Sequence, residues 1–239
     1  GATRVAVGIG GTGTVDGGAG CLIGLGAVLR DAQGRAFDPG SGGLGQVHSL
    51  EWATQDLPEV ELLCDVRSPM VGERGAARLY GPQKGLDQQG VEAVDRHLRH
   101  WARLLDKRFD CDPSELAFAG AGGGLAGGLM AACGAVPRSG IGRIAEHLQL
   151  DAAISTATIV VTGEGCADAQ SQEGKVIDHV LRRASEIGRP VQIFAGRIEP
   201  GAARWLASRG ARARAVAPAH LSESEAMEQA HELLVSAAR

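Results

Sequence analysis

The sequence predicts an α/β protein of two domains. In the second half of the chain, short β-branched strands alternate with amphipathic helices, which is typical of a parallel sheet with crossover helices. A polar break at Asp110, Asp112 and Pro113 interrupts the chain near its middle. The length of 239 residues suits one large domain or two small ones. We therefore expect a domain boundary near residues 110–120.

In the first half, the expected elements are two buried strands and two helices. Residues 4–8 (RVAVG) and 60–66 (VELLCDV) are short, apolar and β-branched, which favours buried strands. Residues 21–29 are apolar and predict a helix, which two glycines weaken. Apolar residues recur at helical spacing over 91–105, with charged residues on the other face, so this segment predicts a long amphipathic helix.

The second half predicts three strand–helix pairs in succession. Strands are expected at 158–161, 191–194 and 213–216, and helices at 176–187, at 202–209 and from Ser222 onward. Ser222 and Glu225 have the spacing of a capping box, which predicts the start of the last helix. Gly188 is placed to end the helix before it in a left-handed conformation.

Composition excludes several classes of function. The net charge of −4 gives no basic face, so we expect no nucleic-acid partner. Five cysteines without a CxxC pair argue against a disulfide framework and a zinc site, and favour a reducing cytoplasm. No apolar run approaches the ~20 residues of a membrane span, so no membrane partner is expected.

A glycine-rich segment, GIGGTGTVDGG at 8–18, follows the first strand and precedes an apparent helix. Backbone amides freed by glycine can cradle an oxyanion there, helped by the helix dipole. Thr12 and Thr14 add hydroxyl donors, and Asp16 adds a carboxylate. No GKS or GKT follows, so this is not a Walker loop. A tight turn that needs glycine for positive φ explains the same residues without a ligand.

Two further segments carry residues suited to ligand chemistry. Asp65 lies at the carboxyl end of a strand, where α/β proteins place ligands, although a turn or helix cap is its structural alternative. Lys84 lies in the loop YGPQKG at 80–85, where a flexible ammonium reaches a phosphate or stays solvated. Residues 120–128 (GAGGGLAGG) enter a small-residue helix, which suits an anion cradle or close helix packing.

The segment TGEGCADAQSQEGK at 162–175 has the residue types of a catalytic site. It carries Glu164, Asp168, Gln170 and Lys175 just past a strand and into a helix. Phosphoryl transfer needs carboxylates that hold a metal, a cation on the transferring phosphate and a base near the acceptor hydroxyl. The segment therefore favours phosphoryl transfer.

Four segments in this order resemble signatures of the ATP-dependent glycerate kinase family. GIGGTGTVDGGAG at 8–20 is similar to the family's GIGGSATNDGGAG, and residues 64–85 are similar to CDVxNPLxGxxGAAxxFGPQKG. GAGGGLAGG at 120–128 resembles GAGAAGGLG, and residues 162–175 resemble TGEGRLDxQTxxGK. The resemblance runs essentially along the whole chain, and the GPQKG and TGEG segments are specific in combination.

This resemblance implies two α/β domains with the active site in the cleft between them. One has a flavodoxin-like parallel sheet built from both ends of the family's chain, and the other is a smaller inserted α/β domain. Residues 1–118 would form the inserted domain, and 119–239 the carboxyl-terminal part of the flavodoxin-like one. The implied reaction transfers the γ-phosphoryl group of ATP to D-glycerate with the help of Mg²⁺. The implied location is the cytoplasm, and a homodimer is one possible assembly.

The matched motif positions, together with the chemistry of phosphoryl transfer, give the expected site residues, which are polar, charged or glycine. The expected catalytic residues are Asp16, Asp65, Lys84 and Lys175. The expected substrate- or phosphate-binding residues are Gly11, Thr12, Thr14, Gly17, Gln83, Gly122, Gly123, Glu164 and Gln170. The expected metal ligands are Asp65 and Asp168.

The chain departs from the family at several points. It opens Gly1-Ala2-Thr3 and enters a strand at once, so we expect a missing amino-terminal segment. Val15 and Ser68 each stand where the signatures have Asn, and Cys166 stands where they have Arg. A truncated or inactive relative that binds nucleotide or a hydroxy acid without turnover is therefore an alternative. A nicotinamide-dependent oxidoreductase is another, but no acidic residue ends a second strand about 20 residues after a GxGxxG loop.

Overall fold

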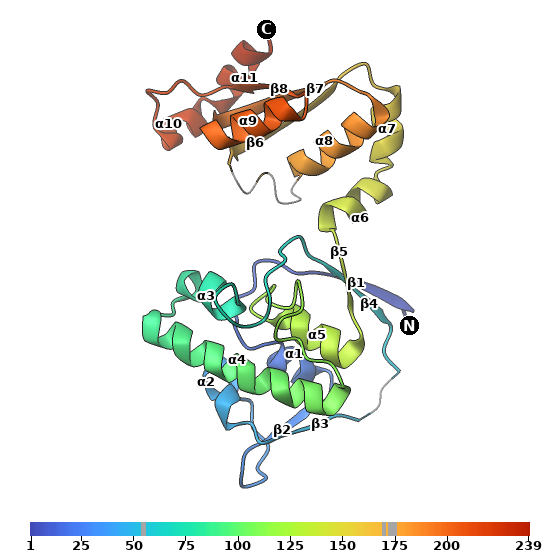
Figure 1. The fold of residues 1–239 in the computed structure, drawn as a ribbon, viewed down its shortest axis with the longest axis vertical. Helices are drawn as coiled ribbons and strands as arrows, with labels where there is room; N and C mark the ends of the chain where they lie inside the picture. The colour runs from blue at the N-terminus through green and yellow to red at the C-terminus, as the bar shows by residue number, and fades with distance from the viewer. Residues whose placement is uncertain (54–55, 169–170, 172–175) are drawn as a thin grey trace. The chain divides into compact units, whose positions relative to one another are not determined.

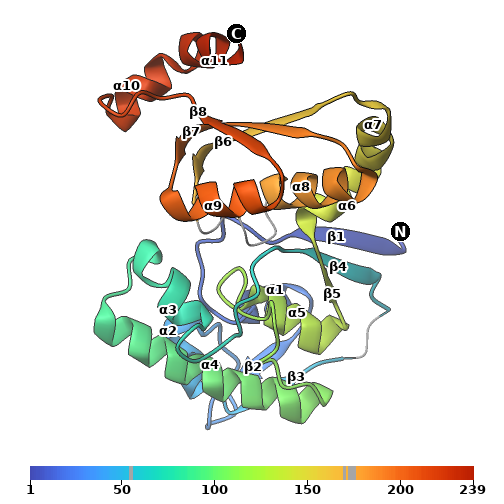
Figure 2. The ribbon, with the colours of Figure 1, turned by 45° about the horizontal axis from the view of Figure 1, so that its top comes forward.

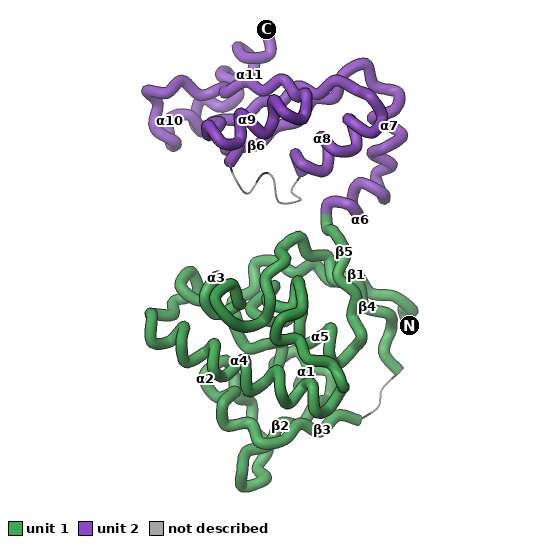
Figure 3. Tube along the Cα trace, in the orientation of Figure 1, with its two compact units in different colours: residues 1–140 green, residues 141–239 purple. Residues whose placement is uncertain are grey.

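The computed structural model describes residues 1–53, 56–168, 171 and 176–239. They form two compact units, unit 1 over Gly1–Gly140 and unit 2 over Ile141–Arg239 (Figures 1 and 3). Parallel sheets and helices in both units confirm the predicted α/β class. The division falls later than the predicted boundary at 118, because α5 (Leu125–Cys133) packs on helices of unit 1. Whether the units are the inserted and flavodoxin-like domains stays a prediction.

Unit 1 contains one parallel sheet and one small antiparallel ribbon. The parallel sheet has the order β1 (Arg4–Gly8), β4 (Glu59–Leu63) and β5 (Val136–Arg138), and the ribbon pairs β2 (Val28–Arg30) with β3 (Ser49–Glu51). The predicted helix over 21–29 is wrong in its second half. α1 (Ala19–Gly24) ends early, and Gly26 takes a φ of +97° that turns the chain into β2. The glycines thus end the helix rather than weakening it.

The core of unit 1 is built around α4 (Gln88–Phe109), which extends the helix predicted over 91–105. Asp87 caps its start by accepting a hydrogen bond from the Gly90 amide at 2.8 Å. Leu98 and Trp101 are fully buried on its inner face, as the helical spacing predicted. Short helices surround it: α2 (Gly40–Gly43), η1 (Leu44–Gln46), α3 (Ala76–Tyr80) and η2 (Pro82–Lys84). These carry the 80–84 segment that forms part of the site below.

Unit 2 has the alternation that the sequence predicted. Its parallel sheet has the order β6 (Val160–Ala167), β7 (Val191–Ile198) and β8 (Arg212–Ala215). Its helices are α6 (Gly140–His147, which begins at the last residue of unit 1), α7 (Leu150–Thr156), α8 (Val176–Ile187), α9 (Pro200–Ser208), α10 (Glu223–Glu228) and α11 (Ala230–Ala238). The predicted capping box is confirmed, because the Ser222 hydroxyl accepts from the Glu225 amide and the Glu225 carboxylate accepts from the Ser222 amide.

The core of unit 2 lies between its sheet and two helices. α8 and α9 cover one face of the sheet (Figure 2). Ile177 and Leu181 of α8 and Leu206 of α9 are buried in one cluster with Ile193 of β7. Within the described parts of both units, no helix combines the length and the apolar character that a membrane crossing requires.

Candidate functional site

The two glycine-rich loops of unit 1 lie backbone to backbone. The Gly17 amide donates to the Gly123 carbonyl at 3.1 Å. A Cβ on Gly123 would lie 2.0 Å from the Thr14 carbonyl oxygen, and one on Gly124 would lie 2.7 Å from the Gly17 Cα. All three glycines also have positive φ, between +63° and +90°. Glycine is therefore required here by close packing, which brings the loop at 8–18 against the loop at 120–124.

The first loop also has an open side. A Cβ added to Gly10, Gly11 or Gly13 would meet no atom within 4 Å. Glycine at these positions leaves the backbone accessible, as an anion cradle needs. Val15, by contrast, is buried in the core of unit 1, so its side chain faces away from this open side.

Lys84 reaches across to the first loop. Its ammonium donates to the Thr12 hydroxyl at 3.0 Å and to the Thr14 carbonyl at 2.7 Å. An ammonium has three donors, so one remains for a ligand. Burial lowers the pKa of Lys84, and the nearby Asp16 carboxylate partly opposes that shift. Residues 70 and 72 positions apart thus meet around one cation.

A pocket of about 160 Å³ opens beside this lysine. Its lining comes from all three segments that the sequence singled out in unit 1: Ile9, Gly10, Gly11, Thr12, Val66, Tyr80, Gln83, Lys84, Ala121 and Gly122. We call it the Lys84 pocket. Pockets for drug-sized ligands start near 300 Å³, so this one suits a small anionic group. Four of the predicted binding residues line this pocket: Gly11, Thr12, Gln83 and Gly122. A fifth, Thr14, contacts Lys84 through its carbonyl.

Asp16 takes a capping position in this structure. Its carboxylate is buried and accepts from the Gly18 amide at 3.0 Å and the Gly20 amide at 2.9 Å. These bonds hold the turn that starts α1. A catalytic role for Asp16 stays a prediction.

Asp65 follows β4 and is exposed. Its Oδ1 accepts from both the Ser139 hydroxyl and the Gly140 amide, each at 3.0 Å. It thus tethers the segment at which α6 begins. Asp65 is not among the described residues that line the Lys84 pocket. Its predicted catalytic and metal-binding roles stay predictions.

In unit 2, Ser171 joins two of the predicted acidic residues. Its hydroxyl donates to Glu164 at 2.6 Å and accepts from the Asp168 amide at 3.1 Å, while its own amide donates to the Asp168 carboxylate at 3.2 Å. The Ser171 side chain is buried, with 1% exposed. Sequence reasoning missed it, although a lone hydroxyl between acids in the 162–175 segment was a usable signal. Gln170 and Lys175 lie outside the described residues.

Strand β6, which carries Glu164, borders a pocket of about 770 Å³ within unit 2. Thr162, Glu164 and Cys166 of β6 line it, together with apolar residues that include Phe194 and Met227. Its volume falls in the range of small-molecule and cofactor sites. The residues Glu164 and Thr162 thus bring a carboxylate and a hydroxyl to the lining of a large, mainly apolar pocket.

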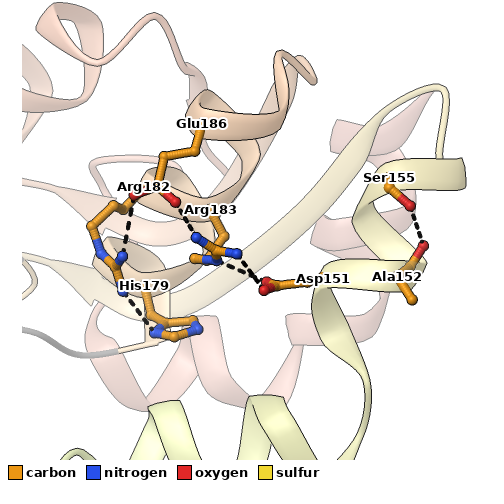
Figure 4. A network of polar contacts seen from close by, with 7 residues as sticks. All are labelled: Asp151, Ala152, Ser155, His179, Arg182, Arg183 and Glu186. Carbon is orange, nitrogen blue, oxygen red and sulfur yellow. Dashed lines mark hydrogen bonds and ion pairs between the residues drawn. The ribbon is translucent and has the colours of Figure 1, made fainter.

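A charged cluster joins α7 and α8 elsewhere in unit 2 (Figure 4). Arg183 pairs with Asp151 through Nε at 2.8 Å and also pairs with Glu186. Arg182 pairs with Glu186 at 3.2 Å and lies 3.5 Å from the His179 Nδ1. Burial and the Arg182 charge lower the pKa of His179. The cluster consists of compensated ion pairs, so we assign it a structural role.

Comparisons with known proteins follow the same segments. The sequence model of the Glycerate kinase family matches residues 1–239. The glycerate 2-kinase of Escherichia coli (strain K12) is 40% identical over 200 residues, which are 82% of this chain and 52% of that protein. The glycerate kinase of Halalkalibacterium halodurans is 33% identical over 243 residues, covering 100% of this chain and 64% of its own length.

A solved structure agrees with these relatives. The protein from Salmonella typhimurium LT2 that carries the name glycerate kinase 2 superposes with a TM-score of 0.76 at 34% identity, over 98% of this chain and 62% of that one. The chain thus spans only about half to two-thirds of the length of the relatives it matches. Because the family model covers all 239 residues, the chain belongs to the glycerate kinase family.

Proposed function

We propose that the chain belongs to an enzyme that transfers the γ-phosphoryl group of ATP to D-glycerate. The Lys84 pocket is the observation that carries this proposal, because it joins a cation, a hydroxyl and an open glycine backbone around a small volume. These groups suit a carboxylate or a phosphate. The names of the relatives from Escherichia coli and Halalkalibacterium halodurans, which specify glycerate, point to the same substrate.

Each of the proposed site residues has a separate task in this proposal. Lys84 neutralises the charge of the bound carboxylate or phosphate, and the amides of Gly10 and Gly11 orient its oxygens. The carboxylates of Glu164 and Asp168, which Ser171 holds in place, serve the metal-bound phosphate chain. Lys175 and Gln170 keep their predicted roles in phosphoryl transfer, which depends on positioning and charge stabilisation.

Mg²⁺ is the metal that we propose, with Asp65 and Asp168 as ligands. Among the described residues, no three His, Cys, Asp or Glu side chains gather into a metal-binding group. Proteins commonly hold Mg²⁺ through one or two carboxylates while substrate phosphates and water complete the shell, so the proposal needs no more than these two side chains. When bound, the ion would neutralise charge on the phosphates.

A coupled ADP-release assay with Mg-ATP, with and without D-glycerate, tests the proposal. We expect glycerate-dependent release, and we expect Lys84→Ala to reduce turnover about a hundredfold or more, as for other lost charge stabilisers. Lys107→Ala is the matched control, because Lys107 is an exposed lysine of α4 in the same unit. Full turnover in Lys84→Ala would refute the role of the pocket.

The same experiment separates the proposal from its main alternative. ATP binding without any glycerate-dependent ADP release would favour a binding protein rather than a kinase. Because the chain spans only part of its relatives' length, the assay is run on this chain and on the same chain joined to the part of a full-length relative that it does not span. Release only in the second case would keep the proposed reaction and assign part of its machinery to that segment.

A further inference from the structure

One residue of the Lys84 pocket has no role in the proposal so far. Tyr80, at the end of α3, lines the pocket beside Lys84. Its ring centroid lies 6.0 Å from the Lys84 ammonium, at the outer limit of a cation–π contact. Its hydroxyl lies 3.3 Å from the hydroxyl of Ser68. The tyrosine thus has one face toward the lysine and its polar end against a second segment of the chain.

Ser68 is a fixed anchor for that hydroxyl. It is buried, with 4% exposed, and its carbonyl accepts from the Gly120 amide at 2.9 Å. A Cβ on Gly120 would lie 2.7 Å from the Ser68 hydroxyl oxygen and 2.1 Å from the Pro69 carbonyl oxygen. The backbone at 68–69 therefore lies directly against the second glycine loop. This close packing and the burial of Ser68 restrict the position of its hydroxyl.

The contact closes a ring of segments around the pocket. Lys84 binds the first loop through Thr12, and Gly120 opens the second loop, which supplies Ala121 and Gly122. Between them, the Tyr80 ring contacts the Lys84 ammonium and its hydroxyl contacts Ser68. Tyr80 is the largest side chain that lines this pocket of about 160 Å³, so truncating it should enlarge the pocket.

We propose that Tyr80 is a specificity-determining residue, anchored by Ser68, that keeps Lys84 against the first loop and restricts the pocket to a single carboxylate- or phosphate-sized anion. The identity of the ligand rests on the proposed function, whereas the size limit rests on the pocket itself. D-glycerate and inorganic phosphate are the two small probes, and citrate, a tricarboxylate, is the large one.

The test is a double-mutant cycle in binding, measured by calorimetry on the full chain. Tyr80→Phe removes only the hydroxyl, and Ser68→Ala removes its partner. Whichever small anion the unmodified chain binds, we expect each variant to bind it with about three- to tenfold lower affinity, as for the loss of one neutral hydrogen bond. We expect the double variant to bind no worse than either single one, because the two changes remove the same contact.

Tyr80→Ala tests the size limit. It is expected to weaken binding of the small anion and to raise citrate binding relative to it at least about tenfold. Leu79→Ala is the matched control, because Leu79 is the preceding residue of α3, is 48% exposed and does not line the pocket. Circular dichroism checks that each variant folds. If Tyr80→Ala fails to fold, the cycle of Tyr80→Phe and Ser68→Ala still decides the anchoring.

The outcomes separate this inference from the proposed function. Additive effects in the cycle, affinities equal to that of the unmodified chain, or no binding of either small anion would overturn the inference. The expected binding pattern without any ADP release would leave the inference standing and count against the kinase reaction. Normal turnover with unchanged affinities in the Tyr80 and Ser68 variants would overturn the inference and leave the proposed kinase reaction standing.

Discussion

Replacing Gly123 by alanine tests the contact between the two glycine loops. Gly123 has a φ of +72°, and this conformation costs an ordinary residue about 1–2 kcal/mol. The new Cβ would also lie 2.0 Å from the Thr14 carbonyl oxygen and 2.9 Å from the Val15 Cα. Both neighbours are backbone, so they yield only by moving a loop, and overpacking of this kind costs about 1–3 kcal/mol. We therefore expect Gly123→Ala to lower the free energy of unfolding by about 2–5 kcal/mol.

Two glycines of the first loop separate the conformational cost of positive φ from the cost of the steric clash. Gly11→Ala meets no atom within 4 Å but keeps a φ of +64°, so only the conformational cost of about 1–2 kcal/mol is expected. Gly13→Ala has neither problem, and its effect should stay within about 0.5 kcal/mol.

Urea unfolding followed by tryptophan fluorescence measures the series. Trp52 and Trp101 lie in unit 1, so a Trp205→Phe background restricts the signal to that unit. The expected order of stability is Gly13→Ala, then Gly11→Ala, then Gly123→Ala. A Gly123→Ala variant as stable as Gly11→Ala would refute the backbone contact between the loops.

The remaining predictions concern single contacts. Trp101→Phe removes the indole donor that reaches the Gly17 carbonyl at 3.0 Å, and should lower the free energy of unfolding by about 1–3 kcal/mol, measured by urea unfolding, because that carbonyl is left buried. His179→Asn should flatten the dependence of unit 2 stability on pH. Because the folded pKa of His179 lies below its ordinary value, the unfolded chain binds more protons than the folded chain. The contribution of His179 to the free energy of unfolding is therefore present above about pH 6.5 and is lost as the pH falls toward the folded pKa. A slope unchanged between pH 7 and 5 would contradict this. Binding of inorganic phosphate should fall at alkaline pH earlier than an ordinary lysine titrates, because burial lowers the pKa of Lys84; calorimetry across pH 8 to 10.5 shows whether it does.

Periodicity predicted the elements whose burial is local. Leu98 and Trp101 identified α4 from their spacing, and the helix expected over 176–187 is α8 among the described residues. The polar break at Asp110 was also real, but it marks the end of α4, where Asp110 takes a φ of +55°. A helix end and a domain edge have the same polar composition, so the sequence alone does not separate them.

The sequence singled out the segments that line the Lys84 pocket, but not the contacts between them. Glycine at position 123 indicates that a Cβ is excluded, yet it does not identify the Thr14 carbonyl as the atom that excludes it. Likewise, nothing local to Lys84 names Thr12 as its partner, because the two lie 72 positions apart. Ser171 was missed because a serine between acidic residues does not by itself show that its hydroxyl is buried between Glu164 and Asp168. Long-range contacts of this kind are what the structure adds.

Asp65 offers a case in which capping and charge can be separated by one substitution. Both hydrogen bonds that it accepts, from the Ser139 hydroxyl and the Gly140 amide, go to Oδ1. Asp65→Asn keeps an oxygen at that position while removing the negative charge and placing an amide nitrogen at Oδ2. If Asp65 only tethers the start of α6, the variant should retain both its stability and its activity.

If Asp65 instead holds Mg²⁺, the same variant should stay folded but lose turnover, and part of the loss should be recovered at higher Mg²⁺ because a weakened site is refilled by mass action. Asp65→Ala removes the accepting oxygen as well, so it should lower stability in either case. Thermal unfolding and ADP release, measured on both variants across a Mg²⁺ titration, therefore assign the two roles independently. Wild-type turnover in Asp65→Asn at every Mg²⁺ concentration would exclude the metal role and leave Asp65 as a cap, the structural alternative that its position after a strand allowed from the start.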